Sequence, residues 1–187
     1  KYKLLQCYGP YEGTWRHHGM ENTLMNLYAE PEYMDEMFEG ITRVTIETLD
    51  YAMEMKLDVD GIWLIEDMGS TRSSLFSPQT YRERLKPFHK RISETSKKYG
   101  LSLFIHSCGE ITNLLPDIID AGFDVVQPLQ ADTTMNVVDL KARFGDKVTF
   151  FGNIDCRKMA QGQDAIKAEL LTKLIPAMKD GGYIYHS

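Results

Sequence analysis

The chain has 187 residues, of which 43% are hydrophobic and 26% charged, with a formal charge of -6 and a pI near 5.4. This composition is typical of a globular domain with one buried core and excludes a disordered chain. Without a cluster of lysines or arginines, the acidic chain has no electrostatic basis for binding nucleic acid, so we expect a small-molecule ligand.

The sequence contains few signals of the cellular compartment in which the protein works. No apolar stretch approaches the roughly 18 to 20 residues of a membrane span, and we find no secretory signal. Three cysteines, Cys7, Cys108 and Cys156, form no dense disulfide framework. We therefore expect a cytoplasmic protein without membrane insertion.

The first segment predicts a short strand at residues 4–8, broken by Gly9-Pro10 and followed by a loop over residues 11–19. Trp15 and His17 place an aromatic and an imidazole group just past a strand end, which suits substrate binding. Adjacent histidines are also common on solvated surfaces, so both interpretations stay open for His17.

Two helices flank the next predicted strand. Apolar residues recur at helical spacing from Pro31 to Met55, and again from Ser77 to Gly100, where Pro87 predicts a kink or break. Between them, residues 61–65 form a continuous apolar run typical of a strand buried on both faces. Glu66 and Asp67 follow it, and strand-end acids either serve a site or cap and pair with neighbouring groups.

An apolar run at residues 103–105 leads to His106 and Cys108. Residues two apart in a strand share a face, so these two side chains are expected to converge. Imidazole and thiolate are common zinc ligands, and a catalytic zinc needs about three protein ligands. The alternative is a buried histidine beside an inert thiol.

The remaining pattern continues the alternation of helix and strand. The predicted helices cover residues 111–121, 137–144 and 165–178, and the predicted strands cover 124–129, 148–155 and 183–186. Polar groups again end the strands, at Gln127, at Asn153 and Asp155, and at His186.

Alternation of this kind gives a parallel α/β fold, either an open doubly wound sheet or a closed (β/α)8 TIM barrel. A barrel gathers all strand carboxyl ends at one rim, where its active sites lie, and the chain has no Gly-x-Gly-x-x-Gly motif of a nucleotide-binding sheet. We therefore predict a single-domain partial barrel with about six of eight strands. The missing strands are expected before Lys1 and after Ser187.

Several motifs together resemble the uroporphyrinogen decarboxylase superfamily. They are Gly9-Pro10, Ile65-Glu66-Asp67, Leu75-Phe76-Ser77-Pro78, Leu85-Lys86-Pro87-Phe88, His106-Ser107-Cys108-Gly109 and Gly152-Asn153-Ile154-Asp155. The resemblance implies a (β/α)8 barrel with one of two activities: metal-free decarboxylation in haem biosynthesis, or zinc-dependent methyl transfer between a corrinoid and a thiol such as coenzyme M.

The His-x-Cys element resembles the methyltransferase branch, because the decarboxylases lack this cysteine. The resemblance implies zinc held by His106 and Cys108, with a third ligand from the last strand, where His186 is the candidate. A corrinoid would be the methyl carrier, on its own or on a partner protein. Cys156 is interpreted as a spectator thiol.

The other strand-end groups receive roles from the same scheme. Glu66, Asp67 and Asp155 are the candidate catalytic or orienting acids. Trp15, His17, Gln127 and Asn153 are the candidate substrate-binding residues. Asn153 and Asp155 are equally interpretable as residues that shape their loop.

Two alternatives remain, a metal-free decarboxylase and a non-catalytic corrinoid-binding paralogue. Trp15 stands near the position of a decarboxylase tyrosine, and the arginine-rich segment of the decarboxylases would precede Lys1, so decarboxylation by this chain alone is not expected. Open strand edges also predict a homo-oligomer.

Overall fold

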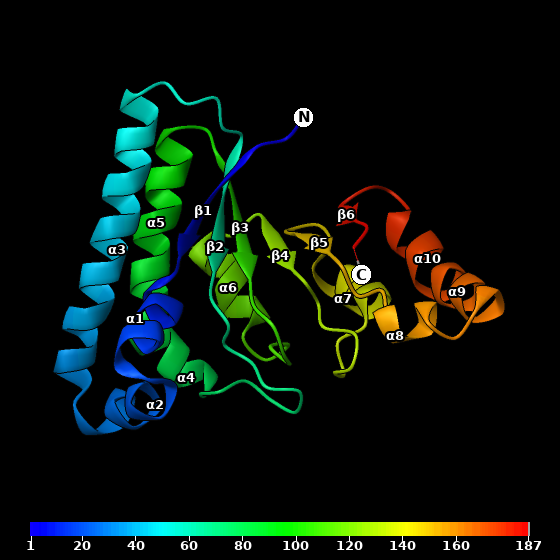
Figure 1. Ribbon diagram of the computed structural model, residues 1–187, viewed down its shortest axis with the longest axis horizontal. Helices are drawn as coiled ribbons and strands as arrows, with labels where there is room; N and C mark the ends of the chain where they lie inside the picture. Colours follow the sequence, from blue (N-terminus) through cyan, green and yellow to red (C-terminus); the bar gives the residue numbers. More distant parts are fainter. Residues whose placement is uncertain (187) are drawn as a thin grey trace.

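A single curved sheet organises the computed structural model, which describes residues 1–186 (Figure 1). Its six strands run parallel and lie in chain order, each paired with the next. They are β1 (Leu4–Tyr8), β2 (Gly61–Ile65), β3 (Ser102–His106), β4 (Val125–Gln127), β5 (Thr149–Phe151) and β6 (Tyr183–Ile184). Within the described residues β1 and β6 do not pair, so the sheet is not closed. The predicted partial barrel is confirmed.

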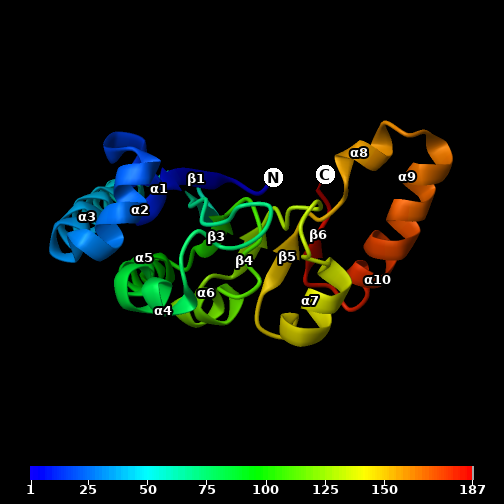
Figure 2. The ribbon, with the colours of Figure 1, turned by 90° about the horizontal axis from the view of Figure 1, so that it is seen from below.

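The helices surround the outer, convex side of the sheet (Figure 2). They are α1 (Pro10–His18), α2 (Met20–Ala29), α3 (Pro31–Glu54), α4 (Pro78–Thr80), α5 (Lys86–Lys98), α6 (Leu115–Ala121), α7 (Val137–Phe144), α8 (Cys156–Met159), α9 (Gln163–Glu169) and α10 (Ile175–Met178). The core lies between these helices and outward-facing strand residues such as Ile62, Leu64 and Ile105, which are fully buried. Over residues 1–186, no helix has the length and apolarity needed to cross a membrane.

The N-terminal segment corrects one prediction. Residues 10–18 form helix α1, not a loop. Pro10 at the first helical turn, Glu12 near the helix start and basic residues in the last turn all favour a helix. Gly9 and Gly13 obscured this pattern in the sequence, and helix α2 was not predicted.

The helix around Pro87 breaks as predicted. A π-helical segment, η1 (Tyr81–Leu85), separates α4 from α5, and Pro87 lies in the first turn of α5. Because Pro87 has no N–H, one carbonyl in the preceding turn lacks its usual donor. The π-helical bulge accommodates this missing hydrogen bond. A second π-helical segment, η2 (Leu170–Leu174), joins α9 to α10 within the other long predicted helix.

Aromatic rings cover part of the concave face of the sheet. The ring of Trp63 stacks on that of Phe104 at 6.0 Å between centroids and meets Phe151 edge-on at 5.7 Å. His106 lies one step nearer the carboxyl ends of the strands, with its ring 6.4 Å from Trp63. The concave face therefore offers an apolar floor that ends at the predicted site.

Candidate metal centre and adjoining pocket

Three side chains with metal-binding atoms meet where β2 and β3 end. They are Asp67, His106 and Cys108, whose ligand atoms all lie within 4.8 Å of one another. His106 Nε2 is 3.5 Å from Cys108 Sγ and 3.5 Å from Asp67 Oδ1. His106 and Cys108 lie side by side, as their two-residue spacing predicts. The third member, Asp67, comes from the neighbouring strand.

The loop after β3 fixes the position of Cys108. The backbone N–H of Cys108 donates to Asp67 Oδ1 at 2.7 Å, and that of Gly109 donates to Gln130 Oε1 at 2.7 Å. Gly109 has a φ of +84°, and a Cβ there would lie 2.3 Å from the backbone of Gly69. Only glycine fits this left-handed turn and close approach, so the Cys108-Gly109 pair serves the geometry of the site.

The environment of Cys108 keeps its thiol protonated in the absence of a cation. Burial, together with the nearby carboxylates of Asp67 and Glu12, raises the pKa of Cys108 to about 11. A thiolate is stable here only if positive charge is supplied. One sulfur, one imidazole nitrogen and one carboxylate oxygen are ligands that zinc accepts, and metal binding displaces the thiol proton. The donor set therefore fits zinc.

Glu12 is a buried residue beside the cluster that the sequence did not reveal. Its carboxylate accepts hydrogen bonds from Trp15 Nε1 at 2.9 Å and Arg16 Nε at 2.8 Å, as well as from the backbone N–H of Asp67 at 3.2 Å. Glu12 thereby joins α1 to the residue that follows β2. Recognising α1 as a helix would have placed Glu12, Trp15 and Arg16 on one face. Trp15 is half-buried, and its indole N–H is used within the protein.

Glu66 lies next to Asp67 but serves a different part of the structure. Its fully buried carboxylate accepts from the backbone N–H groups of Tyr11 at 3.0 Å and Glu12 at 2.8 Å. His89 Nε2 lies 2.8 Å from the same carboxylate, and His89 Nδ1 bonds the hydroxyl of Tyr81. Glu66 thus anchors the start of α1 to α5.

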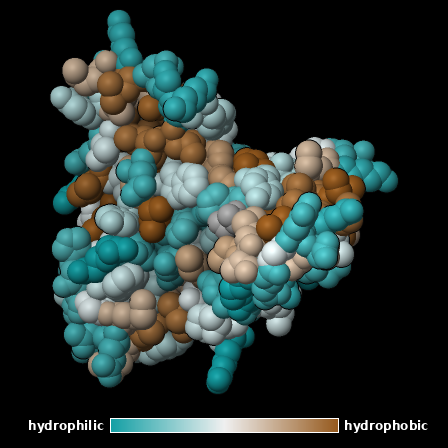
Figure 3. Space-filling model, turned by 45° about the vertical axis from the view of Figure 1, so that its right-hand side comes forward, coloured by the Kyte–Doolittle hydropathy of each residue, from teal (hydrophilic) through white to brown (hydrophobic). Residues whose placement is uncertain are grey.

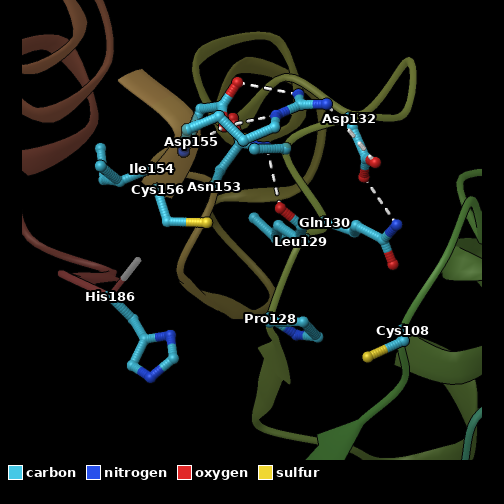
Figure 4. A pocket seen from close by; sticks show the side chains of 12 residues that line it. Cys108, Pro128, Leu129, Gln130, Asp132, Asn153, Ile154, Asp155, Cys156 and His186 are labelled. Atoms are coloured by element: carbon cyan, nitrogen blue, oxygen red, sulfur yellow. Dashed lines mark hydrogen bonds and ion pairs between the residues drawn. The ribbon is translucent and has the colours of Figure 1, made fainter. Parts of the chain in front are cut away.

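A pocket of about 330 Å³ adjoins the cluster (Figure 4). The thiols of Cys108 and Cys156 point into it from opposite sides, and His186 also lines it. His186 does not belong to the group of ligand atoms around Asp67, and its ring packs edge-on against Phe151 at 5.2 Å. A ligand role for His186 stays a prediction.

Two predicted polar residues of this pocket are bonded to protein groups. Asn153 is buried, has a φ of +72° and binds the backbone of Leu129, Met135 and Val137. Asp155 caps α8 by accepting from the N–H of Arg157, whose guanidinium also pairs with it. The paired guanidinium lowers the pKa of Asp155 to about 2. Both residues shape the pocket wall.

The last two predicted residues lie in different places. Gln127 ends β4, is buried, and bonds His106 Nδ1 through its side-chain oxygen. His17 is exposed, with Nδ1 2.6 Å from the carbonyl of Gly13, and it does not line the pocket.

Known proteins resemble this chain in sequence and in fold. Uroporphyrinogen decarboxylases of Vibrio vulnificus and Aliivibrio fischeri are 26% and 27% identical to the chain over 154 residues, which cover 79% of the chain and 40% of each relative. A methyltransferase from Methanosarcina mazei shares the fold, with a TM-score of 0.74 and 18% identity over 96% of this chain and 50% of that one. The chain thus spans half or less of the length of these proteins. Residues 11–187 match the uroporphyrinogen decarboxylase (URO-D) family, and the chain belongs to that family.

Proposed function

We propose that this chain forms part of a zinc-dependent methyltransferase that moves a methyl group between a corrinoid and a thiol. The observation that supports this proposal is the meeting of Asp67, His106 and Cys108 at the carboxyl ends of two neighbouring strands. A metal-free decarboxylase has no need of a thiol and an imidazole 3.5 Å apart at this rim. The name of the Methanosarcina protein agrees with the proposal, although the likeness to it shows only the fold.

The residues of the chain have distinct parts in this scheme. His106 and Cys108 would hold zinc, and Asp67 would supply a third, oxygen ligand. Bound zinc supplies a positive charge that stabilises the thiolate of an acceptor thiol, and the thiolate is the nucleophilic form. The backbone N–H of Cys108 and the carboxylate of Asp67 keep the ligand loop in place. The rings of Trp63 and Phe151 form part of the apolar floor beside the site.

The pocket beside Cys108 is the proposed place for the acceptor. It begins at the thiol of Cys108 and extends along the loops that follow β4 and β5. Its volume lies at the lower end of the range of small-molecule pockets, which begin near 300 Å³. The methyl-carrying corrinoid, free or protein-bound, would then approach from the open side of the rim.

Decarboxylation of uroporphyrinogen is the second candidate. It is favoured by the names of the curated relatives, which are matched over 79% of this chain. A corrinoid-binding paralogue without activity is the third.

Cys108 is the residue that tests the proposal, and Cys156 is its matched control because it lines the same pocket. We expect purified full-length protein to contain about one zinc per chain and to methylate a small thiol from a methylcorrinoid. The Cys108→Ser variant should lose both properties, and Cys156→Ser should keep the zinc. Elemental analysis and a methyl-transfer assay measure them.

Three outcomes would contradict the proposal. Equal zinc content in the parent and Cys108→Ser would exclude the thiolate as a ligand. Conversion of uroporphyrinogen by the metal-free parent would favour the decarboxylase. Corrinoid binding without turnover by the zinc-loaded parent would favour the paralogue.

A further inference from the structure

Gln127 contacts His106 on the side away from the ligand cluster. The two residues are in register on neighbouring strands, β4 and β3. Gln127 is 3% exposed, and its side-chain oxygen bonds His106 Nδ1. Its backbone carbonyl accepts from the N–H of Ser107 at 2.8 Å, so the whole residue is fixed against the strand that carries the histidine.

We propose that Gln127 is a positioning residue that sets the tautomer of His106 for metal binding. This inference rests on the proposed function, since it assigns a role toward the metal. A neutral imidazole carries one N–H, and the other nitrogen keeps a lone pair. An amide oxygen only accepts, so it holds the proton on Nδ1 and leaves the lone pair of Nε2 directed at Asp67 and Cys108.

The opposite amide orientation is disfavoured by the contacts of the cluster. If the NH₂ group of Gln127 faced Nδ1, the proton of His106 would move to Nε2 and need an acceptor there. Asp67 Oδ1 is 3.5 Å away, beyond the 2.7 to 3.2 Å of an N–H···O bond, and already accepts from Cys108 at 2.7 Å. Cys108 Sγ at 3.5 Å is only a weak acceptor.

Trp63 limits rotation of the same ring. Its indole lies 6.4 Å from the imidazole of His106, inclined by 30°. The tryptophan thus restrains one face of the ring while Gln127 holds one edge, and Nε2 is aimed with little freedom. Hydrogen bonds of this kind to a metal-binding histidine typically contribute about 10 to 100-fold in metal affinity or activity.

Two substitutions separate the hydrogen bond from packing. Gln127→Met keeps the shape of the side chain but removes the acceptor, whereas Gln127→Glu keeps an acceptor. Gln79→Met is the matched control, because Gln79 is an exposed amide on α4. Zinc affinity is measured by competition with a chelator. The tautomer of His106 is measured by ¹⁵N NMR of the metal-free protein, at a pH where the ring is neutral.

We expect the parent to show the proton of His106 on Nδ1. Gln127→Met should lose this preference and bind zinc about 10 to 100-fold more weakly. Gln127→Glu should bind within a few-fold of the parent, and Gln79→Met should match it.

The role fails if the parent carries the proton on Nε2, a result that does not depend on the folding of any variant. It also fails if Gln127→Met binds zinc as tightly as the parent while Cys108→Ser has lost zinc. In that case the proposed function would stand, but without a role for Gln127. If the parent binds no zinc, the proposed function fails, and Gln127 has no metal to serve.

Discussion

At the scale of single residues, Asp155 shows how one strand-end acid is used. Because the guanidinium of Arg157 holds the pKa of Asp155 at about 2, below its usual 3.8, folding favours the ionised carboxylate. The stabilisation is complete above about pH 4 and is lost as the pH falls through 2. Arg157 is 58% exposed, so the pair contributes at most about 1 kcal/mol.

Substitution of Asp155 by asparagine isolates the charge, because asparagine also caps helices. We expect Asp155→Asn to melt slightly below the parent at pH 7, and the difference to shrink as the pH falls from 4 through 2. Thermal unfolding followed by circular dichroism across this range measures the difference. Asp146→Asn, at an exposed site after α7, is the matched control for the substitution itself. A gap that stayed constant from pH 7 to pH 2 would contradict the assignment of the charge.

Neighbouring acidic residues in this chain have different roles, and the tertiary contacts of each residue decide its role. Glu66 and Asp67 are adjacent in the sequence, but Glu66 bonds to α1 and α5, whereas Asp67 lies beside His106 and Cys108. Their partners, the N-terminal backbone of α1 for Glu66 and the N–H of Cys108 for Asp67, lie 41 to 55 residues away in the sequence. The acids could thus be located from the sequence, but not their roles.

At the scale of elements, α1 depends on the buried network around Glu66. Removing this carboxylate leaves the N–H groups of Tyr11 and Glu12 and one nitrogen of His89 without their partner. Each buried donor without an acceptor costs about 1 to 3 kcal/mol. We therefore expect Glu66→Leu to lower the free energy of unfolding by about 3 kcal/mol or more.

Urea denaturation measures this loss, and Glu47→Leu on the exposed side of α3 is the matched control. A further variant, His89→Gln, retains a donor toward Glu66 and should lose less stability than Glu66→Leu. Stability of Glu66→Leu equal to that of the parent, with turnover abolished, would instead favour the catalytic role predicted from the sequence.

Elements with regular periodicity were predictable and those shaped by distant contacts were not. Residues 137–144 match α7 because its apolar stripe, Asn136 cap and following glycine agree. Helix α1 was missed because Glu66, 54 residues from Glu12, supplies the acceptor at its start. His106 and Cys108 needed only the strand period, whereas Asp67 joined them through the pairing of β2 with β3.

At the scale of the whole molecule, the order of the strands explains how distant residues form one site. A parallel sheet with strands in chain order places every carboxyl end at the same rim, so Asp67, Cys108 and His186, which follow β2, β3 and β6, reach that rim from distant parts of the sequence. The curvature of the sheet follows from its twist and the helices on one face. The number of strands was predictable from the alternation, but the distances between rim residues were not.

The same open sheet predicts association. Strands β1 and β6 each pair on one side only within residues 1–186, and unpaired backbone groups at such edges bind other strands. Hydrophobic side chains also reach the surface (Figure 3), and Tyr8 on β1 and Ile184 on β6 are 43% and 37% exposed. We expect the chain of residues 1–187 to self-associate in a concentration-dependent manner.

Sedimentation velocity over a range of protein concentrations measures this association. The N–H of Gly9 donates to Ile65 on β2, and N–H groups alternate in direction along a strand, so that of Gln6 faces the open edge. A proline at Gln6 should therefore weaken association, because proline blocks strand pairing. Tyr28→Ser is the control, because it changes an exposed side chain of α2 and leaves both sheet edges intact. A chain that stays monomeric at every concentration, with its circular dichroism spectrum unchanged, would show that the edges of this sheet are protected by their own side chains.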